Sequence, residues 1–166
     1  TSSWAHLTNY DTMYRTFQYK VESKDLKDPK EITDEDSLIG EISIPERNVK
    51  VSVLAQRDPE KIPWGKYGVD VVIEATGVFT KKEDAMKHAV GGARRVVISA
   101  PAKGENVGTY VIGVNEIEDS PEVISNASCT TNCVAPVMSV LESAFGIEKA
   151  AMTTIHAYTD DQNLQD

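Results

Sequence analysis

From residue 68 onward, short apolar runs alternate with segments of helical character, and this rhythm restricts the fold more than any other feature. GVDVVIEATG (68–77) contains three β-branched residues in a row, which is typical of a strand buried on both faces. TKKEDAMKHAVGG (80–92) follows, where Thr80 and Glu83 have the spacing of a helix-capping box and two glycines end the helix. The apolar run in RRVVISAP (94–101) then predicts a second buried strand.

The same alternation continues toward the end of the chain. Short apolar runs occur in GTYVIGVN (108–115) and EVISNAS (122–128), and VAPVMSVLESAF (134–145) predicts a helix that ends at Gly146. A final apolar stretch, AAMTTIHAYT (150–159), predicts one more strand. Strands that alternate with helices predict an α/β fold with a Rossmann-like, doubly wound and mostly parallel sheet.

The first 56 residues follow a different pattern. Apolar residues at helical spacing in SSWAHLTNYDTM (2–13) predict a helix with a serine cap. Alternating apolar and polar residues in FQYKVES (17–23) and VKVSVLAQ (49–56) predict two half-buried strands. The acidic segment between them (27–37) is predicted to be a solvated loop.

Composition excludes several classes of function. The formal net charge of −9 and the pI near 4.8 argue against a nucleic-acid partner, although backbone N–H groups can still bind small phosphates. The two cysteines form no disulfide framework and indicate a reducing compartment, so a cytoplasmic location is predicted. No apolar stretch approaches the length of a membrane span, so no membrane contact is expected. Because the chain begins with threonine and lacks a closing element, we expect a piece of a longer protein.

Three pairs of small or hydroxyl-bearing residues follow predicted strands, at Thr76–Gly77, Ser99–Ala100 and Ser128–Cys129. In open parallel sheets, ligands bind at the carboxyl ends of the strands. Glycine lets a backbone approach a ligand closely, and small side chains leave room beside it. Taken singly, each pair is typical of an ordinary tight turn. Because the three pairs are expected side by side along one edge of the sheet, together they predict a single crevice.

Cys129 lies in SNASCTTNCVAP (125–136), among serines, asparagines and threonines, where a predicted strand passes into a helix. Unpaired N–H groups and the positive end of the helix would then face its sulfur. This environment favours the nucleophilic thiolate and stabilises an oxyanion that forms beside it. The hydroxyls of Ser128 and Thr130 suit a phosphate or a carbonyl oxygen. The pattern predicts a site of nucleophilic catalysis.

The start of the helix leaves two alternatives open. If the helix begins at Cys129, Pro136 lies past the first turn and is expected to kink it. If regular helix begins nearer Val134, the proline is well accommodated, but the argument from the helix dipole weakens.

His156 is the candidate proton acceptor. It lies on the last predicted strand, 27 residues after Cys129, and one strand–helix–strand excursion can bring the two together. The alternative is an ordinary half-buried histidine. His6 and His88 are predicted to be surface residues, and Cys133 a packed thiol. The sequence offers no further ligands at metal-binding spacing.

SNASCTTNCVAP, together with GVDVVIEATGVFT, RRVVISAPAKG, YVIGVNE and MTTIHAYT, closely resembles the phosphorylating glyceraldehyde-3-phosphate dehydrogenases of glycolysis. The resemblance runs through nearly the whole chain and includes IPWG (62–65) and the AHLTNYDT helix. The cysteine motif is highly specific, and the 27-residue separation of Cys129 from His156 also fits this family of oxidoreductases.

The resemblance implies that Cys129 attacks the aldehyde of glyceraldehyde 3-phosphate to give a thiohemiacetal, and that His156 is the base. Hydride then passes to the nicotinamide of NAD, and inorganic phosphate attacks the resulting thioester to release 1,3-bisphosphoglycerate. Ser128 and Thr130 match residues near the inorganic phosphate, and Thr159 matches a residue that contacts the substrate phosphate. The residues that match the cofactor cleft are Thr76, Gly77, Phe79, Ser99 and Ala100.

The resemblance also implies a division into two domains. Residues 1–128 would be a partial dinucleotide-binding domain that lacks its first βαβ unit, and 129–166 the N-terminal part of the catalytic domain. The acidic residue that selects NAD over NADP would lie in the absent unit, so NADP is the alternative cofactor. Members of the family are usually homotetramers. The piece alone is expected to have no turnover, because binding groups on both sides of the reacting centre are missing.

Three features depart from the pattern of the family. Val134 occupies a position where leucine is usual, Arg15 occupies a position where a glycine is expected, and the segment 23–47 is longer and more acidic than usual. If the family's glycine has a positive φ, arginine implies a different turn.

Three alternative functions compete with this reading. A related dehydrogenase that acts on erythrose 4-phosphate is one, although HAYT (156–159) favours the triose enzyme. A cysteine hydrolase is another, but it needs a third residue to orient the histidine, and no strong candidate occurs. A purely structural domain is the third, and the intact Cys129 argues against it.

Overall fold

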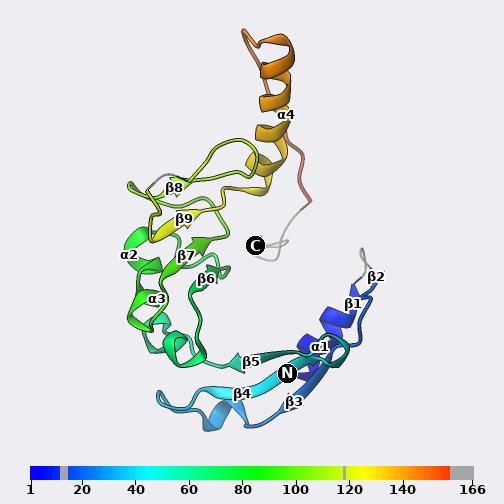
Figure 1. Ribbon diagram of the computed structural model, residues 1–166, viewed down its shortest axis with the longest axis vertical. Helices are drawn as coiled ribbons and strands as arrows, with labels where there is room; N and C mark the ends of the chain where they lie inside the picture. Colours follow the sequence, from blue (N-terminus) through cyan, green and yellow to red (C-terminus); the bar gives the residue numbers. More distant parts are fainter. Residues whose placement is uncertain (12–14, 118, 158–166) are drawn as a thin grey trace, which may run out of the picture. The chain divides into compact units, whose positions relative to one another are not determined.

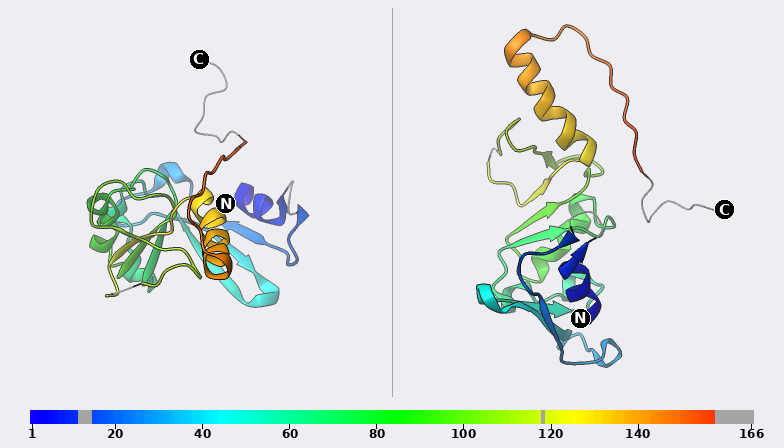
Figure 2. Two further views of the ribbon diagram at one scale, coloured as in Figure 1. Left: turned by 90° about the horizontal axis from the view of Figure 1, so that it is seen from above. Right: turned by 90° about the vertical axis from the view of Figure 1, so that its right-hand side faces the viewer.

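The computed structural model describes residues 1–11, 15–117 and 119–157, which form parts of two compact units. The first unit comprises Thr1–Val71 and Lys87–Arg94, and the second comprises Val72–Met86 and Arg95–Asp166. Figure 1 shows the elements of each unit, and Figure 2 gives two further views.

The first unit contains an antiparallel sheet. Its strands β3 (Glu22–Asp25), β4 (Leu38–Ile44) and β5 (Val49–Leu54) lie in the order β3-β4-β5, and α1 (Ser2–Asn9) lies against β3. The remaining elements are the short pair β1 (Tyr10–Asp11) and β2 (Arg15–Thr16), and the 3₁₀ helices η1 (Pro29–Glu31), η2 (Pro45–Arg47), η3 (Pro59–Lys61) and η4 (Trp64–Tyr67). Ala5, Val21 and Val53 are its buried apolar residues near this sheet.

Several predictions for this unit are confirmed, with altered boundaries. The predicted helix exists but ends at Asn9, and its N-cap is Thr1, whose side chain makes no capping hydrogen bond, rather than a serine. The strand predicted over 49–56 corresponds to β5, whereas the strand predicted over 17–23 is largely wrong, because it overlaps β3 only at Glu22 and Ser23. β4 was not predicted; it follows the acidic loop and pairs with both neighbouring strands.

The predicted surface position of His88 is wrong, whereas His6 is exposed as expected. His88 is only 4% exposed and lies on α3 (Lys87–Val90), where its Nδ1 accepts a hydrogen bond from Trp64 Nε1–H at 3.1 Å. The two chain segments approach closely because Gly91 has no side chain: a Cβ there would lie 2.0 Å from the Ile62 carbonyl oxygen. The IPWG segment and the glycine pair after α3 therefore pack together in the first unit.

The second unit contains the predicted parallel sheet, in the order β6-β7-β9-β8. Its strands are β6 (Val71–Glu74, which starts at the last residue of the first unit), β7 (Arg95–Ile98), β8 (Gly108–Thr109) and β9 (Val123–Ser125). β9 pairs in parallel with both β7 and β8. The helices of this unit are α2 (Lys82–Ala85) and α4 (Cys129–Phe145). The core consists of Ala85 from α2, with Val96, Ile98 and Val123 from the sheet. The predicted α/β class is confirmed.

Three details of this unit correct the predictions. β6 is buried on one face only, since Val71 and Ile73 are 50% and 70% exposed. The single helix expected over residues 80–92 is divided into α2 and α3, and the N-cap of α2 is Lys81 without a side-chain hydrogen bond, so the capping box does not form.

The third correction concerns the last predicted strand. Residues 150–157 have no regular secondary structure, and the part beyond 157 lies outside the described residues. A strand requires a neighbour for its backbone hydrogen bonds, and no described strand pairs with this segment.

Candidate functional site

The three predicted turns lie along one edge of the parallel sheet. The Ser99 N–H donates to the Glu74 carbonyl at 3.0 Å, and the Asn126 N–H donates to the Ile98 carbonyl at 2.9 Å. These bonds connect the carboxyl ends of the neighbouring strands β6, β7 and β9 (Figure 1). The alignment predicted from the sequence is therefore confirmed.

The turn after β6 is open and held by a buried carboxylate. Glu74 is 3% exposed, and its Oε1 accepts hydrogen bonds from both the N–H (2.8 Å) and the hydroxyl of Thr76. Gly77 has a φ of +74°, and a Cβ there would meet no atom within 4 Å. The turn thus needs glycine for its conformation and leaves space beside it. Phe79 is half-buried.

The turn after β7 has small side chains on both of its predicted site residues. Ser99 is exposed and Ala100 is half-buried. The Ala100 carbonyl accepts a hydrogen bond from the hydroxyl of Ser125, the last residue of β9, at 2.8 Å. Ser125 is fully buried, so this bond ties the two neighbouring turns together beneath the surface.

Cys129 is the first residue of α4 and is exposed with a free thiol. The N-cap is Ser128, whose Oγ accepts from the Thr131 N–H at 3.0 Å. Within the described residues, the N–H groups of Cys129 and Thr130 have no protein acceptor. Two free N–H donors and the positive end of the helix therefore lie beside the sulfur, as the first of the two alternatives predicted. Pro136 lies inside this helix.

His156 lies beside the start of α4. The chain after the helix turns back and runs alongside it toward its first residues (Figures 1 and 2). His156 Nε2 lies 3.1 Å from the Thr130 hydroxyl and 2.8 Å from the Thr154 hydroxyl, and these side chains are at least partly exposed. The structure thus brings the imidazole to the residue that follows Cys129, although the segment is not a strand.

Thr154 was not among the residues predicted for the site. Its position two residues before His156 in an alternating stretch was a usable signal, because residues i and i+2 of an extended chain point to the same side. Thr159, by contrast, lies outside the described residues, so its predicted contact with a substrate phosphate stays a prediction.

The prediction that Cys133 is a packed thiol is wrong. Cys133 is exposed, because no residue of α4 is buried in this structure. In the described part of the chain, no three histidine, cysteine or carboxylate side chains gather in a way that could hold a metal ion.

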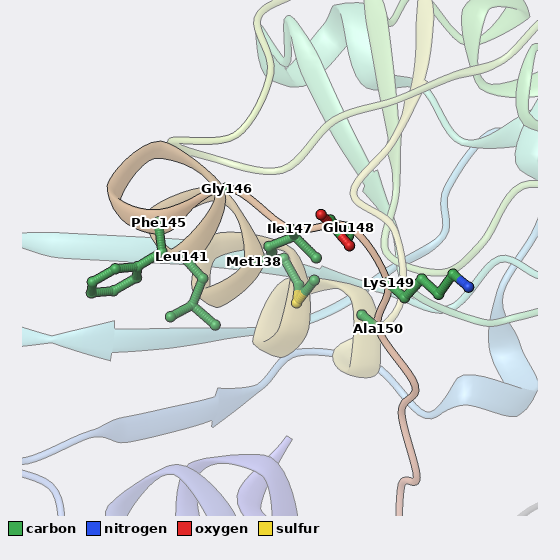
Figure 3. A pocket seen from close by; sticks show the side chains of 8 residues that line it. All are labelled: Met138, Leu141, Phe145, Gly146, Ile147, Glu148, Lys149 and Ala150. Atoms are coloured by element: carbon green, nitrogen blue, oxygen red, sulfur yellow. The ribbon is translucent and has the colours of Figure 1, made fainter.

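A hollow lies at the other end of α4, away from the cysteine. Its walls come from the last turns of the helix and from residues 146–150, with Met138, Leu141 and Ile147 among the apolar side chains around it (Figure 3). It is lined by no cysteine or histidine, so it offers neither a thiol nor an imidazole base.

Two family models match this chain. Residues 1–82 match the NAD binding domain of glyceraldehyde 3-phosphate dehydrogenase, and residues 128–166 match the C-terminal domain of the same enzyme. The match to an NAD binding domain supports NAD as the cofactor. Glycine 77, with open space at the edge of the sheet, fits the close approach of a dinucleotide.

Curated relatives give the same result. The chain is 49% identical over 169 residues to glyceraldehyde-3-phosphate dehydrogenase of Streptomyces coelicolor, covering 100% of the chain and 45% of that protein. It is 48% identical to the enzyme of that name from Clostridium pasteurianum (98% of the chain, 44% of that protein). It is 46% identical to the chloroplastic glyceraldehyde-3-phosphate dehydrogenase B of Pisum sativum (98% and 33%).

The chain spans less than half the length of these relatives. Of the helices in the described ranges, none combines the length and the apolar character needed to cross a membrane. Both family models describe domains of the same enzyme, and the relatives share about half of the aligned residues with this chain. The chain belongs to the glyceraldehyde-3-phosphate dehydrogenase family.

Proposed function

We propose that the full-length protein oxidises glyceraldehyde 3-phosphate to 1,3-bisphosphoglycerate, with NAD as hydride acceptor and inorganic phosphate as the second substrate. One observation carries the proposal: a free cysteine opens α4, and the next residue, Thr130, contacts the imidazole of His156 at 3.1 Å. The names of the relatives support the same reaction.

The first step is addition of Cys129 to the aldehyde. The sulfur forms a bond to the aldehyde carbon, and the carbonyl oxygen becomes an oxyanion that takes a proton to complete the thiohemiacetal. The free N–H groups of Cys129 and Thr130 can donate hydrogen bonds to that oxygen. His156 accepts the thiol proton, since its Nε2 faces the start of the helix.

The second step is oxidation of the thiohemiacetal to a thioester. NAD bound at the sheet edge would supply the acceptor for the hydride of the thiohemiacetal carbon. His156 removes the hydroxyl proton at the same time, so that the carbon–oxygen double bond re-forms and the acyl group stays on Cys129. Thr76, Gly77, Phe79, Ser99 and Ala100 are proposed to line the cofactor side of this site.

The third step is phosphorolysis. An oxygen of inorganic phosphate attacks the thioester carbon, the carbon–sulfur bond breaks, and Cys129 leaves as a thiolate that the helix terminus stabilises. Ser128 and Thr130 are proposed to hold this phosphate near the sulfur. Thr159 is proposed to contact the phosphate of the substrate.

The remaining proposals concern the protein as a whole. We infer that residues 1–128 belong to the dinucleotide-binding domain and that residues 129–166 begin the catalytic domain. A homotetramer follows from the family resemblance. A cytoplasmic location is inferred from the two cysteines, which are both free in the structure.

The test is the NAD-dependent turnover of glyceraldehyde 3-phosphate by the full-length protein, with and without inorganic phosphate. We expect Cys129→Ala to lose turnover completely, and the matched variant Cys133→Ala to keep it. Omission of phosphate should stop turnover after one thioester per subunit. NADP assayed in place of NAD measures the cofactor preference.

Three results would contradict the proposal. Faster turnover of erythrose 4-phosphate would favour the related dehydrogenase, and cleavage of amides without NAD would favour a hydrolase. Retained activity in Cys129→Ala would remove the cysteine mechanism.

A further inference from the structure

We infer that Asn132 is a positioning residue for Cys129, because its side-chain amide holds the preceding turn in the conformation that starts α4 at the cysteine. The inference relies on the proposed function only in naming Cys129 as the nucleophile. Neither the family matches nor the sequence pattern assigns a role to this asparagine.

The amide of Asn132 bridges the turn before the cysteine. Its Nδ2 donates hydrogen bonds to the carbonyl oxygens of Asn126, at 2.7 Å, and Ser128, at 2.9 Å. These two carbonyls flank Ala127, which has a φ of +61°. One side chain therefore spans both sides of the single left-handed residue in the turn.

Such a turn must be held by its surroundings, because a residue with a Cβ disfavours the left-handed region. Ser125 holds it from the strand side, where its buried Oγ accepts from the Ala127 N–H at 3.1 Å. Asn132 holds it from the helix side. Ala127 itself is 4% exposed and its N–H bond to Ser125 is buried, whereas the two bonds from Asn132 are exposed.

The same contacts determine where the helix begins. The Ser128 carbonyl accepts from the backbone N–H of Asn132, at 2.9 Å, as well as from its side chain. Pro136 has no N–H and cannot donate to the Asn132 carbonyl, so the first turn of α4 is joined to the rest of the helix by one bond fewer. The amide of Asn132 compensates by fastening the first turn to the chain before it.

Loss of the amide should therefore loosen the first turn and move the start of the regular helix away from Cys129. The sulfur would then lose part of the helix-terminal stabilisation of its thiolate. The expected signature is a slower reaction of the Cys129 thiol, which a purely structural contact elsewhere in α4 would not produce.

The experiment measures the rate of alkylation of Cys129 by iodoacetamide at neutral pH, in the full-length protein with Cys133→Ser as background. We expect Asn132→Ala to lower this rate about threefold, because the thiolate loses part of its stabilisation by the helix terminus. Asn126→Ala is the matched control: its side-chain amide makes no hydrogen bond in the described residues, and its main-chain carbonyl still accepts from Asn132.

A second variant guards against misfolding. Asn132→Leu keeps a side chain of similar shape and removes both N–H donors without adding a charge. It should slow alkylation as Asn132→Ala does, with an unchanged circular dichroism spectrum. Rates equal to that of the parent protein in both variants, or an equal fall in Asn126→Ala, would overturn the inference.

Turnover of the full-length protein separates this inference from the proposed function. Asn132→Ala should lower kcat by up to about threefold, in parallel with the rate of alkylation, with little change in the KM for NAD. If the unsubstituted protein had no dehydrogenase turnover, the proposed function would fail, while the alkylation rates would still decide the role of Asn132.

Discussion

Ser125 shows how one buried hydroxyl can support a reactive turn. It is fully buried, donates to the Ala100 carbonyl at 2.8 Å and accepts from the Ala127 N–H at 3.1 Å. Ser125→Ala leaves both partners unsatisfied in the interior, so we expect the free energy of unfolding to fall by about 1–3 kcal/mol. Urea unfolding followed by circular dichroism measures the change. Ser139→Ala, at a half-buried position of α4 without a side-chain hydrogen bond in the described residues, is the control and should change little.

Arg15 supplies the second prediction at the scale of a residue. Its φ is +67°, so arginine keeps the left-handed conformation that a glycine adopts more easily. We expect Arg15→Gly to raise the free energy of unfolding by about 0.5–1 kcal/mol, as measured by urea unfolding. Arg15→Ala keeps a Cβ and should bring no such gain. Equal stabilisation by the two variants would point to the lost charge rather than to the backbone.

At the scale of elements, a side-chain hydrogen bond connects η4 with α3. Both helices are short, and neither their periodicity nor their capping predicts that they are stable alone. The donor is Trp64 Nε1–H and the acceptor is Nδ1 of the buried His88. We expect a double-mutant cycle of Trp64→Phe and His88→Leu to give a coupling energy of about 1 kcal/mol, with the double variant less destabilised than the sum of the singles. Additive losses would show that the two side chains act independently.

The elements also show how far the sequence could predict this structure. The parallel strands and the turns at their carboxyl ends were predictable, because β-branched runs and small turn residues report local conformation directly. The strand expected around Ile155 does not form in the described residues, because pairing depends on a neighbour that local pattern does not reveal. His88 is buried because its segment packs against the segment of Trp64, which lies 24 residues earlier, and the small Gly91 permits this packing. The spacing of residues in the sequence could not indicate that contact.

The residues of the candidate site were likewise predictable only in part. Cys129 at the start of a helix was predictable from its strand-to-helix position, and the contact of His156 with Thr130 confirms that the excursion returns the chain to that point. Asn132 was not predictable as a support for the turn. Its two acceptors are carbonyls, which every residue has, so no feature of the sequence distinguishes an asparagine that binds them from one that faces solvent.

At the scale of the whole molecule, the two units contain different residues that can serve as probes. Both tryptophans, Trp4 and Trp64, belong to the first unit, whereas both cysteines belong to the second. The acidic loop of the first unit (27–37) is largely exposed, as predicted, although Ser37 at its end is buried, and Asp34 and Asp36 pair with Lys61 and Lys27. Tryptophan fluorescence therefore follows the stability of the unit that contains these ion pairs.

The pairs predict an acid-sensitive first unit. The hydrogen bond from Lys61 Nζ, at 2.7 Å, lowers the pKa of Asp34 below its ordinary value of 3.8, and the bond from Lys27 lowers the pKa of Asp36 in the same way. Because the folded pKa is the lower one, the unfolded chain binds more protons, and the stabilisation is present above pH 3.8 and is lost as pH falls through the folded value.

We expect the urea midpoint of tryptophan fluorescence to fall between pH 5 and pH 3, and to fall less steeply in Lys61→Met, which lacks the Asp34 pair. Lys30→Met removes an exposed lysine that makes no side-chain ion pair in the described residues, and should follow the parent chain. High salt should weaken the effect, since both pairs are exposed. Hydrogen exchange in β7 serves as the internal reference, because Lys61→Met should leave protection in the second unit unchanged. Equal acid sensitivity in Lys61→Met and Lys30→Met would mean that the pairs of the acidic loop do not set the stability of the first unit.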